Sequence, residues 1–169
     1  MKNNKNVEFR MANEVDAKAI ESIARIIWNE HYITIITQEQ INYMLHLMYS
    51  ETSIKEQMKR GCEFTLLFVD QELMGYLSIE ESIEEPGHFF MHKFYIHQKV
   101  RRTGVGEELF KFVIDKKNSI KELRLFVNRQ NYKAINFYFK MGFVIEKVID
   151  QPIGDGFFMN DFVMLKGYS

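Results

Sequence analysis

A short basic turn, Arg101 to Gly106, carries the residues best suited to bind an anion. The aromatic and β-branched residues before it, Phe94, Tyr95 and Ile96, are typical of a strand. The apolar residues after it have the spacing of one helix face, at Val105, Leu109, Phe112 and Val113. The turn therefore lies at a helix N-terminus, where backbone N–H groups are unpaired and the helix dipole is positive. Two arginines add charge and two glycines let an anion approach the backbone, so the sequence predicts a phosphate-binding site.

The spacing of the glycines excludes two common phosphate motifs. A P-loop needs Lys followed by Ser or Thr after its last glycine, and a dinucleotide-binding loop needs glycine where this chain has Leu109. What remains is the pattern Arg101-x-x-Gly104-x-Gly106 directly after a strand. A solvated loop that only caps the helix is the alternative.

A candidate proton acceptor, His92, lies on the predicted strand just before this turn. Residues of one parity on strand 88–97 share a face, and they are His88, Phe90, His92, Phe94 and Ile96. An imidazole, with an ordinary pKa of about 6.5, suits proton transfer near neutral pH. Glu80 and Glu81, at the end of the preceding strand, are alternatives. An ordered water as the base, and a histidine that serves only in packing, also remain open.

A second group of candidates lies on a predicted helix, residues 132–140. Asn131, Ala134 and Tyr138 occupy one stripe of this helix and can line one wall of a narrow groove. A phenol, with an ordinary pKa of about 10, is protonated at neutral pH and can donate a proton. The structural alternatives are a helix N-cap for Asn131 and a core aromatic for Tyr138.

Both segments resemble signatures of the GNAT superfamily of acyl-CoA-dependent N-acetyltransferases. The basic turn matches the pattern R/Q-x-x-G-x-G/A, and Val127 to Phe143 is similar to V-N-x-x-N-x-x-A-x-x-F-Y-x-x-x-G-F. Together they cover residues 88 to 145. The resemblance implies acetyl-CoA as co-substrate, with no metal. The cofactor-binding residues that it implies are Phe94, Tyr95, Ile96, Arg101, Arg102, Thr103, Gly104, Val105, Gly106, Asn131 and Ala134.

The resemblance also implies a reaction, the direct attack of a neutral amine on an acetyl thioester. Such a step needs proximity, a proton acceptor for the amine, polarisation of the carbonyl and a proton donor for the sulfur. Tyr138 is the implied donor, and His92 is our candidate acceptor. The prediction is an N-acetyltransferase that acts on a primary amine of a small molecule or peptide. A non-catalytic CoA-binding module that regulates a partner is the alternative.

The acceptor amine is expected to lie against the N-terminal helices and the last strands. The candidate residues are Trp28, Tyr32 and Glu80, with Asp161 near the end of the chain. The spacing of Trp28 and Tyr32, with the segment 154–161, resembles a branch that includes bacterial spermidine/spermine acetyltransferases. An acidic run, Glu80 to Glu85, favours a cationic acceptor if it faces the groove. Apolar helix stripes and a solvated acidic turn are the structural alternatives.

Length and composition set further bounds. With 169 residues, the chain is predicted to form a single domain, residues 1–169. A net charge of −1 argues against nucleic acid as the main partner, despite Lys93, Lys99, Arg101 and Arg102. The lone Cys62 excludes an internal disulfide and is expected to be a buried thiol. The sequence lacks an apolar run long enough for a membrane span and an apolar signal-peptide core, which predicts a cytoplasmic protein. Dimers are common in the superfamily, so a homodimer stays open.

The predicted fold is α/β (α+β), with a mixed, twisted sheet of about seven strands and helices on both faces. Hydrophobic periodicity predicts strands at 7–11, 63–69, 73–79, 87–97, 122–127, 143–150 and 157–166. Helices are expected after capping boxes that begin at Asn13, Thr37 and Ser53, and again at 104–117 and 132–140. Splaying of the two middle strands to admit the pantetheine arm is implied by the resemblance alone.

Overall fold

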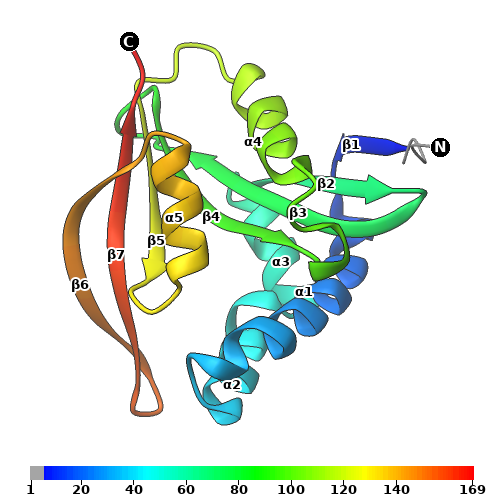
Figure 1. Cartoon of the computed structure of the whole chain (residues 1–169), viewed down its shortest axis with the longest axis vertical. Coiled ribbons are helices and arrows are strands. Elements are labelled where there is room, and N and C mark those ends of the chain that lie inside the picture. Colours follow the sequence, from blue (N-terminus) through cyan, green and yellow to red (C-terminus); the bar gives the residue numbers. More distant parts are fainter. Residues whose placement is uncertain (1–5) are drawn as a thin grey trace. The chain divides into compact units, whose positions relative to one another are not determined.

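The computed structural model describes residues 6–169, which form seven strands and five α-helices (Figure 1). The chain divides into two compact units. The first contains the described residues up to Ile79 together with Lys93–Lys117, and the second contains Glu80–His92 and Asn118–Ser169. Strands β3 (Glu72–Glu81) and β4 (His88–Ile96) contribute residues to both units.

The first unit begins with an antiparallel sheet. Strand β1 (Val7–Met11) pairs with β2 (Glu63–Val69), and β2 pairs with β3. The tight turn between β2 and β3 places Asp70 and Gln71 at positive φ, 51° and 69°, as a two-residue hairpin requires. The predicted hairpin around these residues is therefore confirmed, although β3 extends beyond its predicted ends.

Three helices follow β1 in the first unit. They are α1 (Ala17–His31), α2 (Gln38–Tyr49) and α3 (Glu51–Lys59). The Asn13 side chain forms the predicted capping box with Asp16, which opens a short 3-10 turn before α1, and Thr37 caps α2. The cap predicted at Ser53 is wrong. Ser50 caps α3 instead, because its extended backbone separates α2 from α3 and its hydroxyl accepts from the Ser53 N–H.

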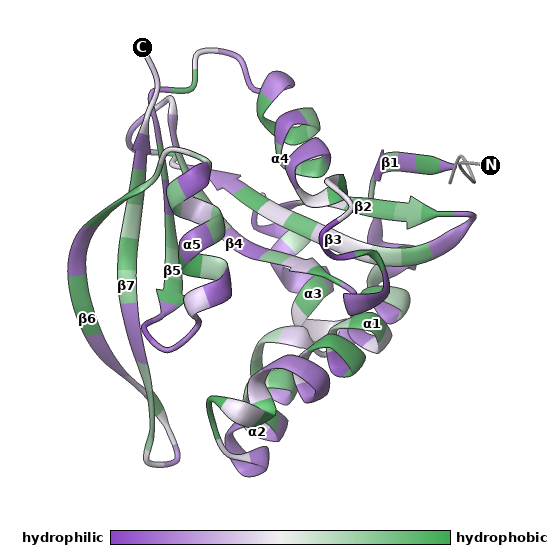
Figure 2. Ribbon diagram, in the orientation of Figure 1, coloured by the Kyte–Doolittle hydropathy of each residue, from purple (hydrophilic) through white to green (hydrophobic). Residues whose placement is uncertain are grey.

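Helices cover both faces of β4 in the first unit, as predicted. The Phe94 ring lies 6.4 Å from Phe110 of α4 (Val105–Asp115), whereas the Tyr95 ring lies 5.9 Å from Trp28 of α1. Successive strand residues point to opposite faces, so α1 and α4 lie on opposite sides of the strand. Figure 2 shows apolar and hydrophilic residues alternating along these helices, and the apolar ones supply most of the buried residues.

The second unit is built on the first part of β4. Strand β5 (Glu122–Asn128) runs parallel to β4, and it pairs on its other side with the antiparallel β7 (Phe157–Gly167). Strand β6 (Val144–Gly154) pairs with β7, and α5 (Tyr132–Lys140) connects β5 to β6. The strand order is β1-β2-β3-β4-β5-β7-β6, which confirms the mixed seven-stranded sheet.

A buried lysine ties β4 to α3 within the first unit. Lys93 is 5% exposed, and its ammonium donates to the Gln57 side-chain oxygen at 2.5 Å. The Gln57 amide nitrogen in turn donates to the Met48 carbonyl (2.9 Å) and the Ser53 hydroxyl (3.0 Å). Burial lowers the pKa of Lys93 from 10.5 to about 8. Lys93 is therefore a member of a polar core network and is not available for binding nucleic acid.

Replacing Lys93 by Met is expected to change how stability depends on pH. Below pH 8 both states carry the proton, and the buried charge reduces stability by on the order of 3 kcal/mol. Between pH 8 and 10.5 the unfolded state binds more protons, so wild-type stability rises with pH, whereas this rise is absent in Lys93→Met. Urea unfolding at pH 7 and pH 10 measures the difference.

The exposed Lys99→Met is the matched control, because its side chain is 65% exposed. Loss of a partner for Gln57 lowers the stability of Lys93→Met equally at both pH values, so it does not affect the comparison. Equal pH dependence in wild type and Lys93→Met would contradict the buried charge.

Candidate functional site

The predicted anion-binding turn directly follows β4. A 3-10 turn, Gln98–Val100, comes first, and the His97 ring caps it by accepting from the Lys99 N–H at 3.2 Å. The Arg101 Nε donates to the Ile96 carbonyl (2.8 Å), and the Thr103 hydroxyl donates to the Val100 carbonyl (2.7 Å). Burial lowers the pKa of Arg101. Arg101 thus braces the turn against the strand as well as bringing positive charge.

Gly104 determines the conformation at the start of α4. It is the N-cap and has φ +91°, a left-handed conformation that favours glycine, and Arg102 nearby has φ +62°. A Cβ at Gly104 would meet only the Glu108 carboxylate, at 3.9 Å, so the backbone angle and not crowding requires the glycine. The Glu108 N–H donates to the Gly104 carbonyl at 3.1 Å. The amides of residues 105–107 therefore belong to the first helical turn, where N–H groups are available to an anion.

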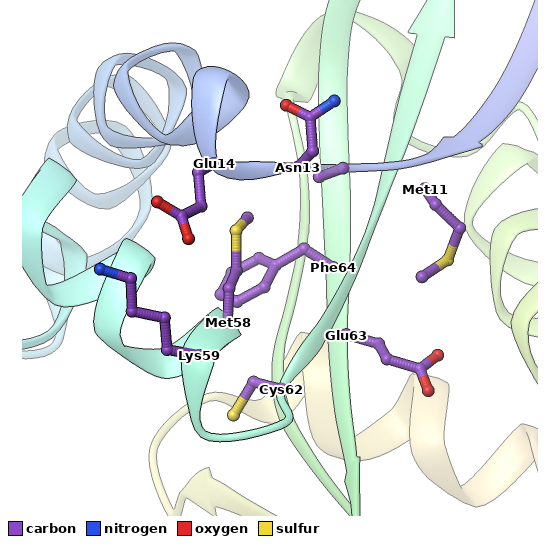
Figure 3. A pocket seen from close by; sticks show the side chains of 9 residues that line it. Met11, Asn13, Glu14, Met58, Lys59, Cys62, Glu63 and Phe64 are labelled. Atoms are coloured by element: carbon purple, nitrogen blue, oxygen red, sulfur yellow. The ribbon is translucent and has the colours of Figure 1, made fainter.

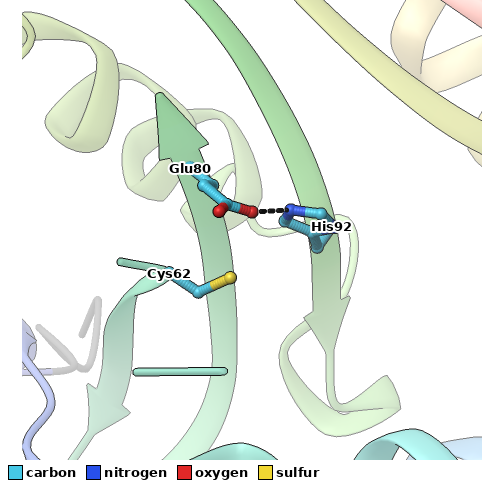
Figure 4. Close-up of side chains that lie close together, drawn as sticks. All are labelled: Cys62, Glu80 and His92. Carbon is cyan, nitrogen blue, oxygen red and sulfur yellow. Dashed lines mark hydrogen bonds and ion pairs between the residues drawn. The ribbon is translucent and has the colours of Figure 1, made fainter. Parts of the chain in front are cut away.

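Glu80 and His92, predicted as alternative bases, are in contact in the second unit. The His92 Nε2 and the Glu80 Oε2 lie 2.7 Å apart (Figure 4), and both side chains are about one-third exposed, at 33% and 34%. The other alternative, Glu81, accepts from the Gly87 N–H at 2.8 Å and so fixes the turn between β3 and β4. When the Nε2–H donates to Glu80, Nδ1 is the nitrogen that can accept a proton.

Asn131 and Tyr138 are positioned by α5 in the second unit. The Asn131 side chain caps the helix by accepting from the Ala134 N–H at 3.3 Å, and the residue is 5% exposed. The Tyr138 ring is buried and packs edge-on against Phe137 at 5.6 Å and Phe143 at 5.5 Å. The structural alternatives for both residues thus hold. They do not exclude the predicted roles, because a cap and a packed ring hold their polar atoms in fixed positions.

An aromatic cluster in the first unit consists of Trp28, Tyr32, Tyr49, Tyr76 and Tyr95. The Trp28 and Tyr32 rings stack at 4.2 Å, and the Tyr49 and Tyr95 hydroxyls lie 2.9 Å apart. Within residues 6–169, no partner is found for the buried Trp28 indole nitrogen or the Tyr76 hydroxyl. Sequence reasoning found Trp28, Tyr32 and Tyr95 but missed Tyr49 and Tyr76. Tyr76 and Ser78 lie two residues apart on β3 and therefore share a face. This pair of polar groups in an apolar strand could have indicated that Tyr76 belongs to the cluster.

Asp161 is a buried carboxyl group in the second unit. It is 3% exposed, and it lies opposite Asn128 of β5 and Ile149 of β6 in the strand register. Burial raises the pKa of Asp161 to about 6, although nearby Arg129 opposes the shift. Arg129 itself pairs with Asp150 at 2.6 Å. The sequence predicted Asp161 as a contact of the acceptor amine but did not indicate that it is buried.

One pocket of the first unit contains none of the predicted catalytic or binding residues. It has a volume of about 280 Å³ and lies between the end of β1, the end of α3 and the start of β2 (Figure 3). Its lining includes Met58, Phe64 and the buried thiol Cys62.

Among the helices that the structure describes, none is long and apolar enough to cross a membrane.

Comparison with known proteins identifies the family. Residues 33–154 match the model of the acetyltransferase (GNAT) domain. A spermidine N(1)-acetyltransferase of Thermoplasma acidophilum is 28% identical over an alignment of 169 positions, which spans 96% of this chain and 98% of that protein.

Solved structures agree with this assignment. The crystal structure of PaiA N-acetyltransferase from Thermoplasma acidophilum in complex with coenzyme A is 26% identical, with a TM-score of 0.81 over 96% of this chain and 99% of that one. Arabidopsis thaliana Naa50, solved with a bisubstrate analogue, shares the fold at 18% identity and a TM-score of 0.67, over 96% and 99% of the two chains. Because the domain model covers more than half of the sequence, this chain belongs to the GNAT acetyltransferase family and is an acetyl-CoA-dependent N-acetyltransferase.

Proposed function

We propose that the protein transfers the acetyl group of acetyl-CoA directly to a primary amine of a small cationic molecule, with residues 1–169 acting as one catalytic domain. The observation that carries the proposal is the left-handed turn at Gly104, which leaves the first amides of α4 available next to two arginines. The relative with the spermidine N(1)-acetyltransferase name supports a polyamine as the acceptor. A peptide amine is the second candidate, since Naa50 shares the fold.

The residues present fit the diphosphate of coenzyme A. In the first unit, the amides of residues 105–107 provide donors, and Arg101 and Arg102 provide positive charge. In the second unit, α5 carries the other predicted coenzyme A contacts, the amide of Asn131 and the small side chain of Ala134. In the bound state, coenzyme A supplies an activated acetyl thioester. The proposed steps on the protein side use no metal ion.

His92 is the proposed proton acceptor for the amine, and Glu80 is its positioning residue. Their 2.7 Å contact orients the imidazole. An imidazole so placed takes a proton from the ammonium group of the substrate, directly or through a water. This leaves the neutral amine that attacks the thioester. The exposed position of both side chains allows a substrate to approach.

Tyr138 is the proposed proton donor for the departing sulfur. Its ring is held between Phe137 and Phe143, so the hydroxyl has a defined position. Since a phenol is protonated at neutral pH, it can donate to a thiolate as that charge develops.

The aromatic cluster is the proposed contact surface for the acceptor. Tyr32, stacked on the buried Trp28, offers an aromatic ring face that attracts an ammonium group. Tyr32 is more exposed than Trp28, which makes its ring the accessible face of the pair. The carboxylate of Glu80 suits the same cationic class of substrate.

Tyr138→Phe is expected to lower kcat by about 100-fold, because general acid catalysis contributes roughly that much or more. The affinity for coenzyme A should change little, since the ring and its packing remain. The measurement is thiol release from acetyl-CoA with spermidine, a short peptide and a neutral amine as acceptors. Tyr132→Phe removes the same hydroxyl from the same helix at a residue that is 69% exposed, and it serves as the control.

Undiminished turnover in Tyr138→Phe would remove this residue as the acid. Binding of coenzyme A with no thiol release on any amine would instead point to a regulatory CoA-binding module.

Glu80→Gln is expected to lower kcat/KM by roughly 10-fold, because an amide oxygen accepts a weaker hydrogen bond from the His92 imidazole than a carboxylate does. His92→Gln should lower kcat/KM by roughly 100-fold and abolish the acidic limb of the pH profile. The profile is recorded from pH 5 to 9 with spermidine.

Glu84→Gln, a change of the same kind on the exposed turn, is the control for Glu80→Gln. If both Glu80→Gln and His92→Gln keep the wild-type profile, the base is a water molecule and not this pair.

A further inference from the structure

Two phenylalanine rings lie beside the proposed base on one face of the sheet in the second unit. The Phe90 ring of β4 lies 4.8 Å from the His92 ring and 4.7 Å from the Phe126 ring of β5. Phe126 is 41% exposed, although β5 has a neighbouring strand on each side. Exposed apolar side chains that lie together are more informative than single ones. The two rings therefore form an aromatic surface next to His92.

Asp161 of β7 lies on the same face of this sheet. In the strand register, Phe126 is opposite Val163, and Asn128 is opposite Asp161. Opposite residues of an antiparallel pair share a face, and so do residues two apart on one strand. Phe126 and Asp161 therefore point to the same side. This face presents the imidazole of His92, an aromatic middle and a carboxyl group, in that order.

The Asp161 carboxyl group is buried without a paired cation. It is 3% exposed, and within residues 6–169 no hydrogen bond or ion pair to its side chain is found. Arg129, the nearby cation, donates instead to Asp150 at 2.6 Å. Burial raises the pKa of Asp161 to about 6, so the group is still mostly charged at neutral pH. A buried carboxylate is costly unless a cation pairs with it, which points to a cationic ligand.

The spacing along this face matches a long, slender amine. Phe90 lies opposite Arg124 in the parallel pair, so His92 is level with Phe126. With strands about 4.8 Å apart and a rise of about 3.4 Å per residue, Asp161 lies two strands across and two residues along, about 12 Å from His92. An extended spermidine spans about 11 Å between its terminal nitrogens, since nine bonds of about 1.5 Å zigzag between them. Putrescine, with five such bonds, spans only about 6 Å.

We infer that this face is the acceptor subsite for a polyamine, whose reacting amine lies at His92, whose methylene chain lies over the two phenylalanine rings and whose distal ammonium pairs with Asp161. Charge complementarity identifies the occupant, because a polyamine has the same order of polar ends and apolar middle as this face. The low exposure of Asp161 admits a slender primary ammonium and excludes a bulky cation. The inference rests on the proposed function, since it takes His92 as the base.

Two linear amines that differ in one group test the role of Asp161. Diaminooctane with an amine at each end has the length of spermidine, and octylamine lacks only the distal ammonium. In the wild-type protein, kcat/KM for diaminooctane should exceed that for octylamine by at least about 10-fold. Asp161→Asn should lower kcat/KM for spermidine and diaminooctane by roughly 10- to 100-fold, mainly through KM, and leave octylamine unchanged. Asp115→Asn, at a side chain of α4 that is 60% exposed, is the control.

Phe126→Ala tests the aromatic middle of the subsite. It should lower kcat/KM by roughly 10-fold for both diaminooctane and octylamine, because the methylene chain loses its apolar contact. Ethylamine, which is too short to reach the ring, should be unaffected. Phe139→Ala, at a residue of α5 that is 47% exposed, is the matched control and should leave all three amines unchanged. Thiol release from acetyl-CoA measures each rate.

Retained turnover of octylamine shows that Asp161→Asn is folded, and the comparison of the two amines in the wild-type protein needs no variant. Equal kcat/KM for diaminooctane and octylamine in the wild type would overturn the inference while leaving acetyl transfer intact. An Asp161→Asn variant that affects both amines alike, or neither, would overturn it as well. Absence of thiol release with any amine would instead overturn the proposed function, and this inference with it.

Discussion

Packing on both faces of β4 is the constraint on which the site depends. In the first unit, Phe94 contacts α4 on one side, and Tyr95 contacts the aromatic cluster on the other. Gly75 of β3 allows a close approach here, because a Cβ at this position would lie 2.6 Å from the Tyr95 carbonyl oxygen. The end of β4 is therefore held in place from three directions. The turn that follows β4 therefore begins at a well-packed position. Hydrogen bonds from Arg101 to the Ile96 carbonyl and from Thr103 to the Val100 carbonyl hold this turn, which leads into α4.

Ionisable groups with unusual surroundings occur in both units. Lys93 is buried and bonded to Gln57, which in turn bonds to Met48 and Ser53, and these contacts indicate a structural role. The Glu80–His92 pair is exposed and has the chemistry of a base with its orienting carboxylate. Asp161 is buried with a raised pKa, close to the end of β5 from which the chain enters α5. The position of a charged residue in the sequence therefore does not indicate its role. Burial and hydrogen bonding distinguish the three cases.

Local patterns predicted most of the fold because their causes are local. The caps at Asn13 and Thr37, the hairpin at Asp70 and the helix from 132 to 140 each follow from a few neighbouring residues. Ser53 was a wrong cap, since two candidate serines lie three residues apart and only the backbone angles distinguish Ser50. The burial of Lys93 and the contact between Glu80 and His92 depend on the pairing of distant segments. Their side chains alone therefore gave no indication of the outcome.

The central claim is that the turn at Gly104 holds the diphosphate of coenzyme A, and calorimetric titration of coenzyme A tests it most directly. We expect one molecule to bind each chain, and Gly104→Ala to bind at least about 10-fold more weakly, because alanine disfavours a φ of +91°. Gly167→Ala, where a Cβ meets nothing within 4 Å, should bind as the wild type does. Absence of any heat of binding to the wild-type protein, or equal affinity in Gly104→Ala, would contradict the account.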